Sequence, residues 1–190
     1  LAAVTELLEK NNHREWRDSF LPCEEKEYEA VVEKEIHPKE GQITMGEVVH
    51  AVSEATNHQA VLVTDVGQNQ MFAARYFKFS QKRSMVTSGG LGTMGFGLPA
   101  AIGAAFGAPN RTVCFFCGDG GLQMTIQELG TIMETGTNVK IILLNNSFLG
   151  MVRQWQELFF KERYSNTPMI NPDFVKIASA YGIKGRKVQQ

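Results

Sequence analysis

The chain alternates between short apolar runs and segments whose apolar residues recur at helical spacing. The apolar runs have the length of buried strands, and glycine or polar residues follow the first four of them. They cover residues 60–66, 84–88, 112–117, 139–144 and, at the end of the chain, 185–190. The helical segments cover residues 44–55, 100–106, 127–135, 151–159 and 173–181. This alternation predicts a doubly wound parallel α/β sheet of about six strands with helices on both faces.

Local signals mark the ends of two of these helices. Thr44 is expected to be the N-cap of the first, and Glu47, three residues later, would complete a capping box. Gly136 is the expected stop of the helix over residues 127–135.

The first part of the chain differs in composition from the rest. Residues 1–40 are rich in charge, with helical spacing on both sides of a break at Pro22. We predict that they form a linker arm from an upstream domain. Residues 41–190 are predicted to form one domain, cut short at its C-terminus, whose ligands the following motifs indicate.

Two predicted strands end in polar residues that suit a metal and a phosphate. Gly118-Asp119-Gly120-Gly121 follows the run at 112–117, and Asn145-Asn146 follows the run at 139–144. In a parallel sheet both ends lie at one edge, where such sheets bind ligands. Carboxylate and amide oxygens suit Mg²⁺ or Ca²⁺, and the glycines leave backbone N–H groups open to phosphate.

One carboxylate cannot neutralise a divalent ion, so we expect a phosphorylated cofactor to supply the remaining ligands. The alternative is an ordinary strand-to-helix turn, with Asp119 as an N-cap and Asn146 in a loop.

A second glycine-rich stretch offers a rival interpretation. Gly90, Gly92 and Gly95 match the spacing of the dinucleotide fingerprint, and Asp119 follows at about the distance of its acidic residue. This would indicate a nicotinamide-dependent oxidoreductase. Against it, Asp119 is embedded in glycines, and Asn145-Asn146 is left without a role.

Charge and composition exclude several classes of function. Hydrophobic residues make up 43% and charged residues 21% of the chain, as in ordinary globular proteins. The formal net charge of -1 argues against a surface that binds nucleic acid or membranes by bulk electrostatics. No apolar run is long enough to span a bilayer, and we expect a cytoplasmic protein.

Cysteine and histidine residues give no metal site. Cys114 and Cys117 form a C-x-x-C within a predicted strand, where positions three apart face opposite sides of the sheet. We therefore interpret both as buried strand residues in a reducing compartment. The four histidines are interpreted as surface or linker residues that form no ligand cluster.

With these motifs in view, the chain resembles a known family. Gly118-Asp119-Gly120 followed by Asn145-Asn146 looks like the cofactor motif of thiamine diphosphate enzymes. Residues 88–104 resemble the signature of acetolactate synthase catalytic subunits almost residue for residue. The resemblance runs from about Gln42 to the end of the chain.

This resemblance implies a set of site residues. The metal ligands would be Asp119, Asn146 and the backbone carbonyl of Phe148, whose side chain would then be free to vary. Met94 would be the wedge that bends the cofactor, and the carbonyl of Gly92 would accept a hydrogen bond from its amino group. The full cofactor-binding set would be Val66, Gly67, Gln68, Asn69, Gly92, Met94, Gly118, Asp119, Gly120, Gly121, Met124, Asn146, Phe148, Leu149, Gly150, Met151 and Val152.

Two positions depart from the family pattern. Asn69 stands where a histidine is common, although its amide can still donate to a phosphate. Gly121 replaces a small hydroxyl residue, which removes a side-chain contact to phosphate but leaves the backbone one.

The apolar face of the helix over 151–159 is open to two interpretations. Met151, Val152, Trp155, Leu158 and Phe159 share this face, which is typical of a core stripe. By resemblance, Met151 and Val152 would instead contact the cofactor and Trp155 would cover the acceptor pocket, so that Met94, Met151 and Trp155 are the predicted catalytic residues.

The resemblance also implies an activity and partners. It implies decarboxylative condensation of pyruvate with pyruvate or 2-oxobutanoate, dependent on thiamine diphosphate and Mg²⁺, in the synthesis of valine, leucine and isoleucine. It further implies FAD in the full-length protein, a homodimer or tetramer with the active site between subunits, and a possible regulatory small subunit. The carboxylate that activates the cofactor would lie outside this chain, so the fragment alone is expected to be inactive. Another thiamine diphosphate-dependent carboligase or decarboxylase is the nearer alternative, and the NAD-dependent oxidoreductase is the further one.

Overall fold

Four parallel strands form one sheet in the order β2-β1-β3-β4. The computed structural model describes residues 12–39, 41 and 43–189. The strands are β1 (Val61–Thr64), β2 (Met85–Val86), β3 (Val113–Gly118) and β4 (Val139–Leu144). Consecutive strands are therefore joined by helical crossovers, and the predicted parallel α/β sheet is confirmed.

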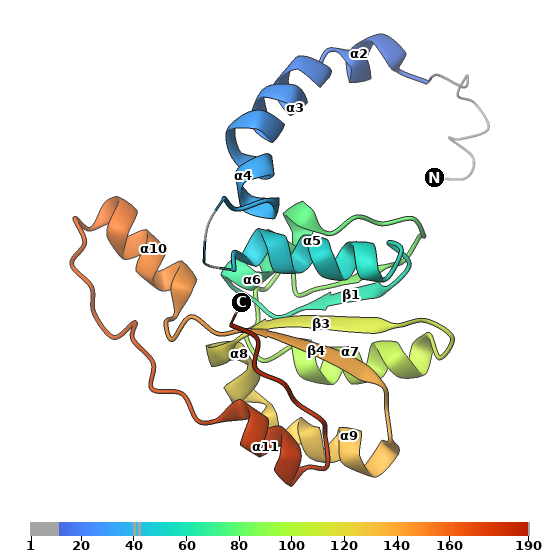
Figure 1. Ribbon diagram of the computed structural model, residues 1–190, viewed down its shortest axis with the longest axis vertical. Coiled ribbons are helices and arrows are strands. Elements are labelled where there is room, and N and C mark those ends of the chain that lie inside the picture. The colour runs from blue at the N-terminus through green and yellow to red at the C-terminus, as the bar shows by residue number, and fades with distance from the viewer. Residues whose placement is uncertain (1–11, 40, 42, 190) are drawn as a thin grey trace.

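Helices cover both faces of the sheet (Figure 1). On one face α5 (Met45–Ala55) and α6 (Gln68–Tyr76) pack on Leu62, Cys114 and Phe116. On the other, α7 (Gly97–Gly107), α9 (Leu129–Thr135) and α11 (Phe174–Ala180) pack on alternate residues, among them Val63 and Phe115. The two central strands, β1 and β3, are buried on both faces, which explains why their apolar residues are continuous rather than alternating.

The predicted helix signals act largely as expected. The Thr44 side chain accepts a hydrogen bond from the backbone N–H of Glu47 at 3.1 Å and so caps α5. Gly136 ends α9 in the left-handed conformation, with φ 64°. The predicted helix over 127–135 is in fact a 3₁₀ turn, Ile126–Glu128, that continues directly into α9.

The sheet has fewer strands than predicted. Residues 185–189, for which a strand was predicted, have no strand structure in the described part of the chain. Gly182, with φ 71°, turns the chain back, and Ile183 then packs into the core while Gly185 lies against Ala178 of α11. The segment follows its own helix and does not reach a strand partner.

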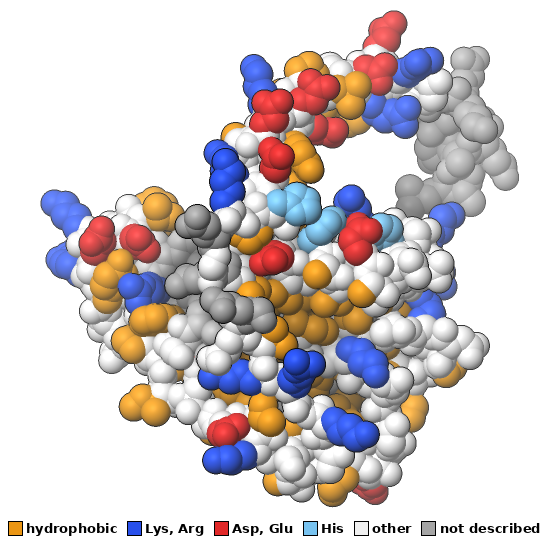
Figure 2. Space-filling view, in the orientation of Figure 1, with side chains coloured by type: hydrophobic (Ala, Val, Ile, Leu, Met, Phe, Trp, Pro, Cys, Tyr) orange, Lys and Arg blue, Asp and Glu red, His pale blue; other side chains and the backbone are white. Residues whose placement is uncertain are grey.

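The charge-rich arm is helical and extends away from the sheet (Figure 1). It consists of α2 (Arg14–Asp18), α3 (Leu21–Glu27), a π-helical turn (Tyr28–Val32) and α4 (Glu33–Ile36). Pro22 lies in the first turn of α3, so it begins a helix there instead of only breaking one. Figure 2 shows acidic and basic side chains along this arm. Residues 1–11 of the predicted linker lie outside the described residues.

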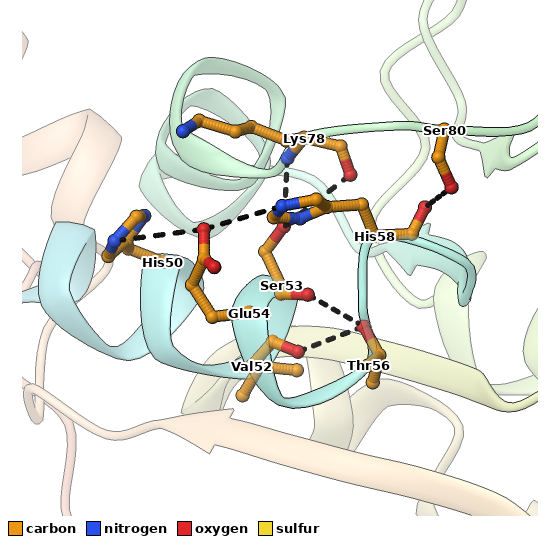
Figure 3. Close-up of polar contacts among 8 residues, drawn as sticks. All are labelled: His50, Val52, Ser53, Glu54, Thr56, His58, Lys78 and Ser80. Carbon is orange, nitrogen blue, oxygen red and sulfur yellow. Dashed lines mark hydrogen bonds and ion pairs between the residues drawn. The ribbon is translucent and has the colours of Figure 1, made fainter.

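A polar cluster joins α5 to the chain after α6, at the amino-terminal edge of the sheet (Figure 3). Ser53 Oγ lies 3.0 Å from His58 Nδ1 and accepts a hydrogen bond from the backbone N–H of Lys78 at 3.0 Å. His58 Nε2 lies 3.4 Å from a Glu54 carboxylate oxygen. Because Ser53 is fully buried, this Ser–His–Glu set holds two segments together and is no nucleophilic site. His58 lies in the turn between α5 and β1 with its side chain 29% exposed, as expected of a surface or linker residue, and its contacts with Ser53 and Glu54 are an addition to that prediction.

No helix among the described residues combines the length and the apolar character needed to cross a membrane.

Candidate functional site

The polar ends of β3 and β4 meet at one edge of the sheet, as predicted. Gly118 pairs in register with Leu144, so the residues that follow each strand begin side by side. Asp119 is the first residue of the short helix α8 (Asp119–Met124) and is only 1% exposed. Gly118, not Asp119, is the N-cap of this helix. The alternative in which Asp119 serves as an N-cap is therefore wrong.

A buried carboxylate at the end of β1 organises the glycine-rich loop. Asp65 is fully buried, and its Oδ2 accepts hydrogen bonds from the backbone N–H groups of Gly95 and Gly97 at 3.1 and 2.9 Å. Its Oδ1 accepts from Val66 N–H at 2.8 Å. Gly97 is the first residue of α7, so the carboxylate also lies at the positive end of a helix. Sequence reasoning missed this residue, although an acid at the end of a buried strand was the available signal.

Close packing around Asp65 brings the predicted cofactor residues together. A Cβ on Gly121 would lie 2.4 Å from Asp65 Oδ1, so Gly121 leaves no room for the hydroxyl side chain found in the family. Gly92 approaches the side chain of Val66, and Gly95 packs against Met124. Residues from three separate stretches thus form one surface.

The loop after β4 is shaped by its own asparagine. Asn146 Oδ1 accepts a hydrogen bond from the backbone N–H of Phe148 at 3.1 Å, which leaves the Phe148 carbonyl as an acceptor on the same turn. The Phe148 ring, which sequence reasoning left without a role, has a cationic partner. The guanidinium of Arg153 lies over it, 4.0 Å from its centroid, and also over the Tyr164 ring at 4.6 Å.

The starts of α6 and α10 (Gly150–Phe159) meet beside this loop. Gln68 Nε2 donates to Gln154 Oε1 at 3.1 Å, and a Cβ on Gly150 would lie 2.2 Å from Gln68 Oε1. A pocket of about 390 Å³ opens here, and four of its lining residues belong to α10. Its lining residues are Gln68, Asn146, Phe148, Gly150, Arg153, Gln154 and Glu157.

Asn69 lies within the site but is not presented at its surface. It is 5% exposed, and its Nδ2 is close to the Cα positions of Gly67 and Gly118. Its Oδ1 is buried without a hydrogen-bond partner in the described residues. The unsatisfied atom is an oxygen, which only accepts, so it suits a ligand that brings a hydrogen-bond donor and not a phosphate oxygen.

The metal ligand predicted from the sequence has a partner that sequence reasoning missed. Asn171 Nδ2 donates to Asp119 Oδ2 at 2.5 Å. The sequence offered no local signal for this contact, because the two residues are 52 positions apart. The cap of α11 is Asp173, whose side chain accepts from Val175 N–H and Lys176 N–H.

The apolar face of α10 is exposed. No residue of this helix is buried, and Val152, Trp155 and Leu158 are 49%, 57% and 66% exposed. Trp155 packs on Phe159, with ring centroids 4.8 Å apart. The interpretation of this face as a core stripe is therefore wrong for the described residues.

The cysteines are strand residues, as predicted. Cys114 and Cys117 are buried on opposite faces of the sheet and are unpaired. Burial raises the pKa of the Cys114 thiol to about 11. Burial, together with the nearby charges of Asp65 and Asp119, raises the pKa of Cys117 well above its ordinary value. Both thiols are thus protonated at neutral pH and are poor ligands and nucleophiles.

The strand order argues against the dinucleotide interpretation. The loop from Gly90 to Gly95 follows β2, and Asp119 follows β3. In the nucleotide-binding fold the glycine loop and the ribose-binding acid follow neighbouring strands. Here β1 lies between β2 and β3.

Comparison with known proteins agrees with this geometry. Residues 65–190 match the family model described as thiamine pyrophosphate enzyme, C-terminal TPP binding domain. The chain belongs to this family.

Within it, the chain is similar to acetolactate synthase large subunits. It is 49% identical over 152 residues to that of Lactococcus lactis, covering 80% of this chain and 26% of the relative. It is 51% identical over 138 residues to the isozyme 2 large subunit of Escherichia coli, covering 72% of this chain and 25% of the relative. The chain thus spans about a quarter of the length of these relatives.

A solved structure shares the fold. The thiamine diphosphate-dependent 4-hydroxybenzoylformate decarboxylase of Rhodococcus jostii superposes with a TM-score of 0.72 at 26% identity. The superposition covers 80% of this chain and 28% of that structure.

Proposed function

We propose that this chain supplies the diphosphate-binding and metal-binding half of an acetolactate synthase active site, as one domain of a longer catalytic subunit. The observation that supports the proposal is the convergence of three strand ends. The Gly118–Gly121 turn, the Asn146–Phe148 turn and Gln68 lie around one edge of the sheet, beside a pocket of about 390 Å³.

The donors at this edge fit Mg²⁺ bound together with a diphosphate. Asp119 would supply a carboxylate oxygen, Asn146 an amide oxygen and Phe148 its carbonyl, all of which are hard ligands. The described residues contain no group of three or more His, Cys, Asp or Glu able to hold a metal ion. A metal here would therefore need phosphate oxygens, and the N–H groups of Gly120 and Gly121 are suitable donors to them.

The remaining predicted residues would orient the organic part of the cofactor. Bound thiamine diphosphate supplies an acidic carbon that adds to 2-oxo acids and accepts the charge left by loss of CO₂. Gly92 would accept from the amino group with its carbonyl, and the flexible thioether of Met94 would fill the bend between the rings. Met124, Leu149, Gly150, Met151 and Val152 would line the rest of the site, and Trp155 would limit the acceptor pocket.

The complete reaction would join pyruvate to pyruvate or 2-oxobutanoate, as a step of branched-chain amino-acid synthesis in the cytoplasm. It would need groups outside this chain, including the activating carboxylate and FAD in the full-length protein. The proposed assembly is a homodimer or tetramer with its active sites between subunits, together with a regulatory small subunit. Residues 1–40 would connect this domain to the preceding one.

Calorimetric titration of the complete subunit with Mg²⁺ and thiamine diphosphate tests the proposal. Asp119→Ala should abolish Mg²⁺-dependent cofactor binding, because the only charged ligand is lost beside a multiply charged diphosphate. Asn146→Ala should weaken it less, since the amide carries no charge. Asp173→Ala, which removes a helix cap outside the site, is the matched control. Unchanged affinity in Asp119→Ala would contradict the metal assignment.

The structural likeness to a decarboxylase supports a second candidate function, that of another thiamine diphosphate-dependent carboligase or decarboxylase. Product analysis separates the two. Pyruvate should give 2-acetolactate as the main product, whereas an aldehyde as the main product from pyruvate or from aromatic 2-oxo acids would favour the decarboxylase.

A further inference from the structure

The segment that follows α10 is held across the loop of the proposed metal site. Met169 N–H donates to the Ser147 carbonyl at 2.8 Å, and Leu149 N–H donates to the Thr167 carbonyl at 2.9 Å. Phe148 and Pro168 form an antiparallel bridge between these two bonds, and Thr167 is fully buried. Asn171 comes two residues after the last of these contacts, so its position relative to the loop is fixed by backbone hydrogen bonds.

The Asn171 side chain joins the ends of two strands and the helix between them. Its Nδ2 donates to Asp119 Oδ2 at 2.5 Å and to Asn145 Oδ1 at 2.9 Å. Its Oδ1 accepts from Gln123 Nε2 at 3.0 Å. The orientation of the amide follows from chemistry, because an ionised carboxylate can only accept. Both amide hydrogens and one oxygen lone pair of Asn171 are thus engaged.

Asp119 depends on such a contact. Its side chain is 1% exposed, and a buried carboxylate is costly unless hydrogen bonds compensate for the lost water. Asn171 engages Oδ2, and in the part of the chain that the structure describes no hydrogen bond reaches Oδ1. The contact therefore fixes the rotation of the carboxylate while it leaves one oxygen available.

We propose that Asn171 is a positioning residue for the metal: it holds Asp119 so that Oδ1 is presented to Mg²⁺. The inference rests on the proposed function, since it takes Asp119 as a metal ligand. A partner that orients the side chain of a metal ligand before the ion binds reduces the conformational entropy that this side chain loses on binding. Loss of such a partner typically weakens metal affinity about 10-fold to 100-fold.

The test is a calorimetric titration of the complete subunit with Mg²⁺ at saturating thiamine diphosphate. Asn171→Leu removes the amide at similar volume, and Asn171→Ala is the second variant in case the leucine is not tolerated. Both should raise the half-saturating Mg²⁺ concentration about 10-fold or more. Turnover at saturating Mg²⁺ should stay close to that of the wild type, since the ligands themselves remain.

Asp173→Ala is the matched control. It lies two residues further along the same segment and removes the cap of α11, which lowers local stability without touching Asp119. Its Mg²⁺ affinity should equal that of the wild type. Melting temperatures of all variants show whether any change in affinity follows stability alone.

The possible results distinguish a failure of the inference about Asn171 from a failure of the proposed function. An Asn171→Leu affinity within about 3-fold of wild type, while Asp119→Asn loses Mg²⁺ dependence, would overturn the inference alone. Equal weakening in Asp173→Ala and Asn171→Leu would also overturn it, because the loop's stability would then be the cause. Unchanged Mg²⁺ affinity in Asp119→Asn would overturn the proposed metal site and the inference together.

Discussion

Asp65 and Gly97, 32 positions apart, are joined by a hydrogen bond of 2.9 Å from the glycine N–H to the aspartate carboxylate. The approach is as close as the residue types allow, since a Cβ on Gly97 would lie 2.9 Å from Asp65 N and 2.2 Å from the Phe115 ring. The bond anchors the start of α7 to the end of β1. It thereby sets the position of Gly92 and Met94, which precede the helix in the same loop.

Asp65→Asn should destabilise the fold. Each carboxylate oxygen accepts from backbone N–H groups, so an NH₂ group in either place would face a donor and leave a buried N–H unsatisfied. We expect a loss of about 1–3 kcal/mol in the free energy of unfolding. Urea denaturation of the complete subunit measures it.

The matched control for this change is Asp173→Asn. Asp173 caps α11 at an exposed position, and aspartate and asparagine are about equally good N-caps. Its denaturation midpoint should stay close to that of the wild type. Equal midpoints for the two variants would mean that the Asp65 carboxylate does not support the loop as described.

The three cysteines should differ sharply in reactivity. Cys23 is exposed, whereas Cys114 and Cys117 are buried and their pKa values are raised, mainly by burial. Iodoacetamide at about pH 8 should therefore label the native protein at Cys23 and leave the pair unmodified, since only the thiolate reacts. Mass spectrometry before and after denaturation counts the labels. If the folded Cys23→Ser variant were still labelled at Cys114 or Cys117, the burial of these two thiols would be contradicted.

The raised pKa of Cys114 also makes the free energy of unfolding depend on pH. Unfolding returns Cys114 from a pKa of about 11 toward its ordinary 9.0. The unfolded state then holds fewer protons on this group, so the free energy of unfolding should fall as the pH rises through this interval.

The pattern of apolar runs was enough to predict the sheet. Strand β4 was predicted to the residue, and β3 was displaced by one position. Both are largely apolar runs that end at or just before glycine or asparagine, although only β3 is buried along most of its length. The shared edge of Asp119 and Asn146 followed from parallel topology alone.

What the sequence could not predict depends on contacts between distant segments. Asn171 is brought to Asp119 by the bonds of Thr167 and Met169 to the loop after β4, and no periodicity encodes such a crossing. The apolar stripe of α10 looked the same whether it faced a core or solvent, because periodicity reports a face and not its partner. Residues 185–189, the described part of the last predicted strand, are not a strand, because Gly182 turns the chain and Gly185 lies against α11.

The exposed position of Trp155 leads to the last prediction, which rests on the proposed function. The indole is 57% exposed and contacts Phe159, so in this chain it contributes little to the core. Trp155→Ala should cost about 0.5–1.5 kcal/mol in stability, the value of one aromatic pair, whereas a core tryptophan would cost about 3–5 kcal/mol.

Acceptor choice should change more than stability in Trp155→Ala. Trp155 lies one turn beyond Met151 on α10, so a cofactor in contact with Met151 would place the indole beside the acceptor. A flat apolar wall discriminates one methylene by about 1–3 kcal/mol, or roughly 10-fold to 200-fold. The complete subunit should therefore keep 2-acetolactate formation but lose most of its preference for 2-oxobutanoate over pyruvate. Product ratios from competing acceptors measure this, with Leu158→Ala, on the same exposed helix, as the control. A stable Trp155→Ala enzyme with a wild-type product ratio would remove Trp155 from the site.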